Sequence, residues 1–549
     1  MTSTIRSIPA VAVLLAVALG SATTPFSPGL AAQEAVSGAP PQLFHTADQC
    51  IACHNGLTAP SGQDISIGFN WRSSMMGNSA RDPYWMASVR RETLDHPAAQ
   101  DALEDKCTVC HLPIARTNAV AAGGQGRAFR NFPLVGGGPN AAVAQDGVSC
   151  TVCHQIRDEK LGTKESFTGG YVIDLTSPMG QRVANGPFEV DAGRTRVMQS
   201  ASELQPVEAA HIQSAELCAT CHTLFTHALD SQGNEVGELA EQVPYLEWRH
   251  SNYPGQSTCQ DCHMPVVEGE TSVAGVLSNP RSEVNQHSFR GGNFLMPRIL
   301  NKHRGELAVQ ALPQELEETA QASEDNLANK AATVRVEPVE RDNGRLLFDV
   351  VVTNLAGHKV PSAYPSRRAW LHLTVRDAGG GVVFESGAMR PDGSIVGNDN
   401  DADAATFEPH YEVITDARQV QIYEDIMVDH AGEVTTGLLW GVEYAKDNRL
   451  LPDGFDKATA SWEVEVRGEA VEDGDFVGGG DRVRYEVEAS DARGPFSVEV
   501  ELWYQPIGFR WAENLATYDT RESAQFDRFF QGVSPTSAVV MARGQGVVR

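Results

Sequence analysis

The sequence predicts an α+β chain of several domains, on three observations. All ten cysteines lie in the first half of the chain, in a stretch interrupted by glycine clusters such as Gly123-Gly124. This pattern predicts a loop-rich, mainly helical domain over residues 40–310. A helical pattern covers residues 311–331 and predicts a connecting helix. From Ala332 onward cysteine is absent and apolar residues alternate with a period of two, which predicts an antiparallel β-sandwich-like domain with a closing helix over residues 332–549.

Residues 1–32 have the features of a secretory signal peptide. Arg6 precedes the apolar stretch Ile8–Gly20, and small residues suited to cleavage follow at Ala22 and Ala32. The apolar stretch is shorter than the roughly 20 residues that span a bilayer, and no later run reaches that length. The sequence therefore predicts an exported protein, periplasmic or extracellular, with no transmembrane segment in its mature chain.

The ten cysteines form five copies of one pattern, Cys-x-x-Cys-His, and none is left over. The copies are Cys50/Cys53/His54, Cys107/Cys110/His111, Cys150/Cys153/His154, Cys218/Cys221/His222 and Cys259/Cys262/His263. This pattern is typical of c-type haem attachment, in which two thiols form thioethers to one haem and the next histidine binds its iron. A zinc site needs no histidine directly after every pair, and a disulfide framework predicts irregular spacings. We therefore expect five covalently attached haems c in the domain over residues 40–310, which makes it a pentahaem cytochrome c domain.

Helix and strand signals along the chain agree with the division into a motif-bearing domain, a connecting helix and a β-domain. Asp82-Pro83 predicts the start of a helix that ends at His96, before Pro97, and Leu316, Ala320 and Leu327 form one stripe of the connecting helix. Asp342-Asn343-Gly344 predicts a hairpin turn between the first two strands. The strand candidates are Ala332–Glu337, Leu346–Asn354, Ala369–Arg376, Val382–Glu385, Val483–Glu488 and Phe496–Tyr504. The closing helix is predicted from aromatic and apolar residues at helical spacing: Trp511, Leu515, Tyr518, Phe526, Phe529 and Phe530.

The sixth position on each haem iron separates an electron carrier from an enzyme. A His or Met there gives an iron that passes electrons, whereas an open position can bind a small molecule. Local context favours His96 at a helix end, His211 shortly before Cys218, and His287 beside a glycine pair. His358 lies in a loop between two strands and would reach a haem across the domain boundary. The alternative for each is an ordinary surface or hydrogen-bonded histidine.

Several segments of the chain resemble exported multihaem cytochromes c related to the cytochrome c-554 type. They include Trp71–Met76, Asp146–His154, Cys218–Leu224, Cys259–Pro265 and Gly357–Pro361. In that family a Trp-x-x-Ser-x-His segment supplies a distal histidine. Here Trp71 and Ser74 match it, and Met76 stands at the histidine position. The resemblance implies redox work and His/Met ligation of one haem; the alternative for Met76 is a residue that fills a gap in the packing.

The formal net charge of −28 argues against nucleic acid and against anionic membrane surfaces as partners. It is typical of transient docking to redox partner proteins with basic patches, although solubility alone could explain it.

Two functions are compatible with these features. The first is a multihaem cytochrome that relays single electrons between exported or membrane-bound partners. The alternative is a multihaem oxidoreductase with one open haem, acting on a small nitrogen or sulfur compound. The pentahaem nitrite reductases carry a Cys-x-x-Cys-Lys motif that this chain lacks, which weakens that version of the alternative. The second domain shows no catalytic constellation, so we expect a role in ligation or docking.

Overall fold

The computed structural model describes residues 43–132 and 141–548. The predicted signal peptide lies outside the described residues. The described residues belong to one compact unit. Within the described ranges, no helix combines the length and apolarity needed to cross a bilayer.

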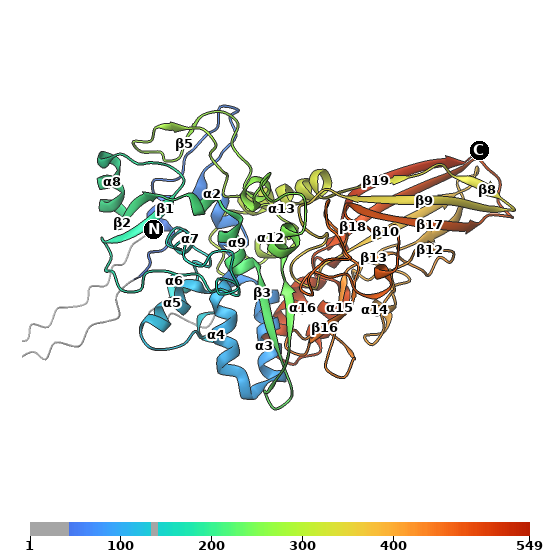
Figure 1. The fold of residues 1–549 in the computed structure, drawn as a ribbon, viewed down its shortest axis with the longest axis horizontal. Coiled ribbons are helices and arrows are strands. Elements are labelled where there is room, and N and C mark those ends of the chain that lie inside the picture. The colour runs from blue at the N-terminus through green and yellow to red at the C-terminus, as the bar shows by residue number, and fades with distance from the viewer. Residues whose placement is uncertain (1–42, 133–140, 549) are drawn as a thin grey trace, which may run out of the picture. The chain divides into compact units, whose positions relative to one another are not determined.

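The half of the chain that carries the motifs consists of short helices and two-stranded sheets joined by loops (Figure 1). The first cysteine of each motif lies on a helix: α1 (Asp48–Ile51), α4 (Gln100–His111), α7 (Cys150–Cys153), α9 (Ala215–His222) and α11 (Cys259–His263). The other helices are α2 (Ile67–Ser73), α3 (Pro83–Asp95), α5 (Pro113–Ala121), α6 (Ala141–Ala144), α8 (Ala192–Ser202), α10 (Pro244–Arg249) and α12 (Leu295–Lys302). The strands pair as β1 (Arg182–Gly186) with β2 (Leu204–Glu208), β3 (Leu224–Leu229) with β4 (Glu235–Gln242), and β5 (Thr271–Ser272) with β6 (Pro280–Arg281).

Helix α3 has the predicted ends. The Asp82 side chain accepts hydrogen bonds from the backbone N–H groups of Tyr84 (2.9 Å) and Trp85 (3.3 Å), which caps the first turn. Pro83 occupies the first helical position, where no N–H donor is needed. The helix ends at His96, directly before Pro97.

The predicted connecting helix is also present, as α13 (Pro313–Asn326) followed by a π-helical turn over Leu327–Ala331. Its stripe of Leu316, Ala320 and Leu327 is buried, as the sequence pattern predicts. Helix α13 packs on α12 and α2, and Glu315 pairs with Arg72 of α2 at 2.5 Å.

The C-terminal half contains two five-stranded sheets whose inner faces share one core (Figure 1). One sheet holds β11 (Val382–Ser386), β10 (Arg368–Arg376), β18 (Phe496–Gln505) and β19 (Val539–Val548), with β13 (Ile422–Tyr423) also on β10. The other holds β12 (Val413–Ile414), β17 (Gly480–Glu488), β9 (Arg345–Asn354) and β7 (Ala332–Val336), with β8 (Glu340–Asp342) also on β9. A smaller sheet joins β14 (Asp425–Val428), β15 (Val434–Thr435) and β16 (Glu443–Asp447), and α14 (Asp399–Ala402) lies in a connection.

The alternation of buried and more exposed residues explains why the sequence pattern predicts these strands. On β9 every second residue from Leu346 to Val352 is buried, and β18 buries Phe496, Val498 and Val500 in the same way. All six predicted strands are confirmed. The sheets of this C-terminal half are antiparallel apart from the short parallel pairing of β12 with β17.

The structure differs from the prediction at the Asn343-Gly344 turn and at the closing helix. The Asn343-Gly344 turn is present with positive φ at both residues, but it joins β8 to β9 because a separate short strand follows β7. The closing helix is two helices, α15 (Phe509–Ala516) and α16 (Arg521–Gln531), and β19 follows them.

Strand β19 escaped prediction because Gly544 and Gly546 weaken its strand signal. Tertiary packing explains Gly544, since a Cβ there would lie 3.0 Å from the carbonyl oxygen of Val334 and 3.0 Å from Val500.

The helices of the two halves pack against each other. Helix α16 lies on α3, where the Phe526 ring is 5.1 Å from the Tyr84 ring between centroids. Tyr84 also meets Tyr364 of the C-terminal half edge-on at 5.8 Å. Residues of α3, α12 and both sheets therefore belong to one hydrophobic core.

We expect Phe526→Ala to lower the free energy of unfolding by about 3–5 kcal/mol, because it leaves a cavity between α3 and α16. Chemical denaturation of the full chain measures the change. Val547→Ala is the matched control, since Val547 is 66% exposed and its truncation should cost less than about 0.5 kcal/mol. Equal effects of the two substitutions would contradict the packing described above.

Candidate cofactor-binding site

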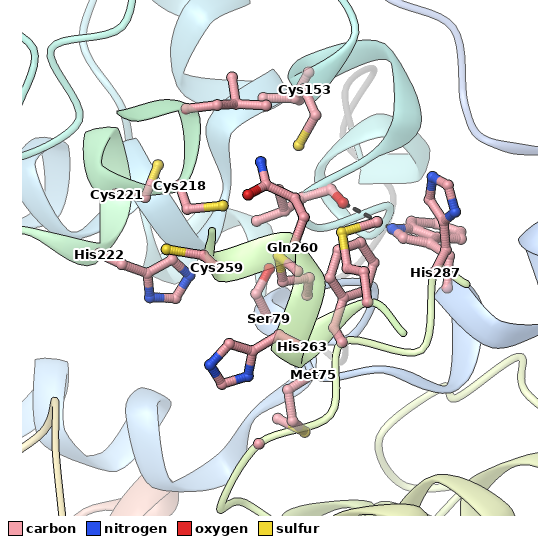
Figure 2. A pocket seen from close by; sticks show the side chains of 18 of the residues that line it. Met75, Ser79, Cys153, Cys218, Cys221, His222, Cys259, Gln260, His263 and His287 are labelled. Carbon is pink, nitrogen blue, oxygen red and sulfur yellow. Dashed lines mark hydrogen bonds between the residues drawn. The ribbon is translucent and has the colours of Figure 1, made fainter. Parts of the chain in front are cut away.

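One cavity of about 1300 Å³ collects all the motif residues. Its wall contains the ten cysteines and the five histidines of the Cys-x-x-Cys-His copies, although these are spread over the chain from Cys50 to His263. Figure 2 shows several of them facing a common space, among them Cys218, His222 and His263. A pocket for a single small ligand has a volume of roughly 300–1,000 Å³, so this cavity is large enough for more than one cofactor.

The motifs are neighbours in an order that differs from their order in the sequence. Thiols of different motifs lie close enough to interact in three places: Cys50 with Cys150, Cys110 with Cys221, and Cys218 with Cys259. Cys153 of the third motif also lies within electrostatic range of Cys221 of the fourth. The first motif is thus linked through the third to the fourth, and the second and fifth both adjoin the fourth.

Backbone carbonyl groups orient three of the motif histidines. The Nδ1–H of His54 donates to the carbonyl of Val273 at 2.7 Å, and that of His154 to the carbonyl of Asn185 at 2.5 Å. His263 donates to the carbonyl of Arg290 in the same way. A carbonyl can only accept, so Nδ1 carries the proton and Nε2 is left with its lone pair for a metal.

Burial favours the neutral form of four motif histidines. It lowers the pKa of His111 and of His263 to about 4, and it lowers the pKa of His154 and His222 as well. His111 is held by packing, because its ring stacks on the Trp85 indole at 4.4 Å with an angle of 1° between the planes. Neutral imidazole is the form that binds a metal.

Two further histidines in the cavity wall each face a motif histidine. The ring centre of His287 is 6.4 Å from that of His154, with 18° between the planes. The ring centre of His358 is 6.1 Å from that of His263, with 11° between the planes. Metal–imidazole bonds of about 2 Å place two rings on opposite sides of one metal with their centres roughly 6 Å apart. Both pairs have the spacing of two axial ligands of one metal.

These two histidines are oriented in the same way as the motif histidines. The Nδ1–H of His287 donates to the carbonyl of Asn285 at 3.3 Å, and that of His358 to the carbonyl of Lys359 at 2.8 Å. Burial lowers the pKa of His287 to about 3. Nε2 is therefore the free nitrogen in both rings.

The structure does not bring His96 or His211 to the cavity wall. His96 is buried against Trp440, with ring centres 4.3 Å apart, and its Nδ1 faces the carbonyl of Asp230 at 3.3 Å. The Nε2–H of His211 donates to the carbonyl of Ile156 at 2.9 Å. Their positions near a helix end and near a motif predicted ligation from local context, but their rings pack elsewhere.

Thioether side chains also line the cavity. Met76 is among them, together with Met75, Met198, Met264 and Met296. The backbone carbonyl of Met76 accepts from Val148 at 2.9 Å, which places this segment beside the third motif. The predicted residue thus borders the cavity, and sequence reasoning missed the contributions of Met198 and Met296.

The cavity wall is rich in cations although the chain as a whole is strongly acidic. The basic residues in it are Lys106, Arg194, Arg281, Arg290, Lys330, Lys359 and Arg367, against Asp82, Glu92 and Glu241. The buried Nε of Arg290 has no hydrogen-bond partner, and a buried unpaired donor is costly unless an acceptor is supplied. Sequence reasoning missed these residues because they come from many separate segments, and each resembles an ordinary surface charge.

The residues present fit c-type haem. Paired thiols, oriented neutral imidazoles and a largely apolar wall match the attachment groups, the iron and the ring of the cofactor. The basic residues of the wall match the carboxylates of the haem. Sequence reasoning did not predict where these carboxylates would bind.

The comparison with solved structures supports the fold. The chain is similar to a penta-heme cytochrome c552 from Thermochromatium tepidum, with a TM-score of 0.52 and 16% sequence identity. The match covers 92% of this chain and 100% of that one. No family model matches the sequence, and none of the curated proteins does.

The buried carboxyl group of Glu241 in the cavity wall should make stability depend on pH. Burial raises the pKa of Glu241 to about 7, and the nearby Glu92 adds to the rise. The native state therefore holds a proton that the unfolded state releases at lower pH, so this group lowers stability as pH rises from about 5 to 7. We expect Glu241→Gln to gain stability relative to wild type over that interval, measured by denaturation at several pH values. Glu238→Gln, at an exposed position of β4, is the control; equal pH profiles for the two variants would contradict the assignment.

Proposed function

We propose that the protein is a multihaem c-type cytochrome that binds five haems covalently and relays single electrons between redox partners outside the cytoplasm. The observation that carries this proposal is the single cavity into which all five Cys-x-x-Cys-His motifs open. Each motif in the cavity wall lies next to at least one other motif. An electron relay requires such closely spaced haem sites. The likeness to a penta-heme cytochrome supports the same function.

In this proposal the residues of the chain have distinct roles. The ten cysteines form the thioethers, and His54, His111, His154, His222 and His263 supply the proximal nitrogens. When bound, each haem supplies an iron that takes up and releases one electron. Backbone carbonyls hold His54, His154 and His263 at fixed orientation, which would limit the change in their ligation between the two oxidation states. Wall cations such as Arg290 and Arg367 pair with the cofactor's carboxylates.

We assign His287 and His358 as distal ligands opposite His154 and His263, on the basis of the two ring spacings. Met76 remains our candidate for a third iron, as the resemblance to the cytochrome c-554 type implies. His96 and His211 receive no iron in this proposal because their rings lie outside the cavity wall. The acidic surface favours redox partners with basic docking patches.

One observation favours the oxidoreductase alternative. Among the described residues, His287 and His358 are the histidines of the cavity wall beyond the motifs, so within that part of the chain His54, His111 and His222 face no histidine of this kind. Arg367 lies within electrostatic range of His222, and its Nη1 donates a hydrogen bond to the carbonyl of Ser362 at 2.8 Å. An open iron beside a cation would suit a small nitrogen or sulfur anion. A ferric spectrum with only low-spin iron would exclude this alternative.

The mass of the mature protein tests the main proposal. We expect it to exceed the polypeptide mass by five haem groups when the protein is made in a host that matures c-type cytochromes. The double variant Cys107→Ser with Cys110→Ser should lose one haem group, because both thioethers of one site are removed. A colourless wild-type protein of bare polypeptide mass would refute the function.

The two distal assignments are tested separately. We expect His287→Ala and His358→Ala each to convert about one haem in five to high-spin iron, because each removes one axial nitrogen. Electron paramagnetic resonance of the oxidised protein measures the high-spin fraction. His372→Ala, in β10 and away from the cavity wall, serves as the control and should leave the spectrum unchanged. A spectrum of His358→Ala identical to that of wild type would remove His358 from the ligand set.

A further inference from the structure

We propose that Glu247 is a positioning residue that fixes the His358 loop of the sandwich half against the haem-binding half. The inference rests on the proposed function and deepens it, since it explains how a ligand from the C-terminal half is held at the His263 site. Glu247 lies on α10, between the fourth and fifth motifs, and does not itself line the cavity.

The carboxylate of Glu247 is fully buried, and its partners come from the other half of the chain. Oε2 accepts a hydrogen bond from the backbone N–H of Lys359 at 3.1 Å and from the hydroxyl of Ser362 at 2.6 Å. Oε1 pairs with Nη1 of Arg449 at 3.0 Å. The Glu247 carboxylate thus contacts Lys359, directly after His358, and also Ser362 of the same loop.

The opposite side of the loop is held by a buried ion-pair network. Nζ of Lys359 pairs with Oδ2 of Asp447 at 2.7 Å, and Nη2 of Arg449 pairs with the same oxygen at 2.7 Å. These two cations balance the charges of Glu247 and Asp447, and Arg449 also lies 3.3 Å from Asp425. Because buried charges are stable only in paired arrangements, the network favours one placement of the loop.

The backbone segment that precedes His358 is also sterically restricted. A Cβ at Gly357 would lie 3.2 Å from the Tyr253 ring and 3.3 Å from Trp248, so the backbone passes tightly between two aromatic residues of the other half. The Tyr253 hydroxyl donates to the carbonyl of Leu355 at 2.8 Å. With Asn354 donating to the carbonyl of His358 at 2.9 Å, the loop is held on both sides of the ligand.

A general stabilising role and a positioning role make different predictions. If Glu247 only stabilised the contact between the halves, its replacement would change the free energy of unfolding and leave the iron spectra as they are. If it positions His358, the replacement alters one iron while all five haems stay attached.

The test uses the full-length holoprotein. We expect Glu247→Gln to keep the mass of five haems, to convert up to about one haem in five to high-spin iron, and to shift one midpoint potential while the other four stay constant. Asp401→Asn is the matched control. Asp401 is also a buried carboxylate and pairs with Arg368 at 2.7 Å, and neither Asp401 nor Arg368 lines the cavity. This control should lower stability without changing spectra or potentials.

Unchanged spectra and potentials in Glu247→Gln, together with an altered spectrum in His358→Ala, would overturn the inference and leave the proposed function standing. If Glu247→Gln does not fold, Ser362→Ala removes one hydrogen bond to the same carboxylate. It should shift the same midpoint potential by a smaller amount, and an unshifted potential would overturn the inference. Absence of haem from the wild-type protein would refute the proposed function instead.

Discussion

The structure depends on one constraint: five imidazoles must stay neutral and oriented in the wall of one cavity. Burial meets the first requirement for four of them, because it disfavours the imidazolium form of His111, His154, His222 and His263. Backbone carbonyls meet the second where they accept from Nδ1. These carbonyls come from other segments of the chain, so a motif helix can be as short as α7, Cys150–Cys153. In the proposed function this arrangement limits the rearrangement that accompanies each electron.

The two halves of the chain are joined by buried polar groups as well as by apolar packing. Glu92 of α3 pairs with Arg91 and accepts from the backbone N–H groups of Leu438 (3.0 Å) and Leu439 (3.3 Å). Glu247 of α10 does the same for the His358 loop. Removing one member of a buried pair costs about 3–5 kcal/mol, so such contacts tolerate few alternative placements. This specificity matters where one half supplies a ligand to a site built by the other.

Charge is distributed unevenly between the cavity wall and the rest of the molecule. The chain carries a formal net charge of −28, yet basic side chains outnumber acidic ones around the cavity. An excess of negative charge keeps a protein soluble and directs its encounters with basic partners. Wall cations such as Arg290 instead lie beside a largely apolar space, where pairing with an anion is strongest. In the proposed function the carboxylates of the cofactor would form ion pairs with such cations. The acidic surface would remain available for redox partners.

The sequence by itself determined the features that depend on neighbouring residues. The five attachment motifs follow from covalent chemistry at fixed spacing, α3 from its Asp82 cap and Pro83, and β9 from alternation. Tertiary structure alone decided which imidazole faces which. The two facing pairs join residues far apart in the chain, whereas local context favoured His96, whose ring packs on Trp440 instead. Strand β19 was hidden for the same reason, since Gly544 weakens its local signal and serves a close contact with β7. Local patterns record bonds between neighbours, while ligand pairing depends on how distant segments pack.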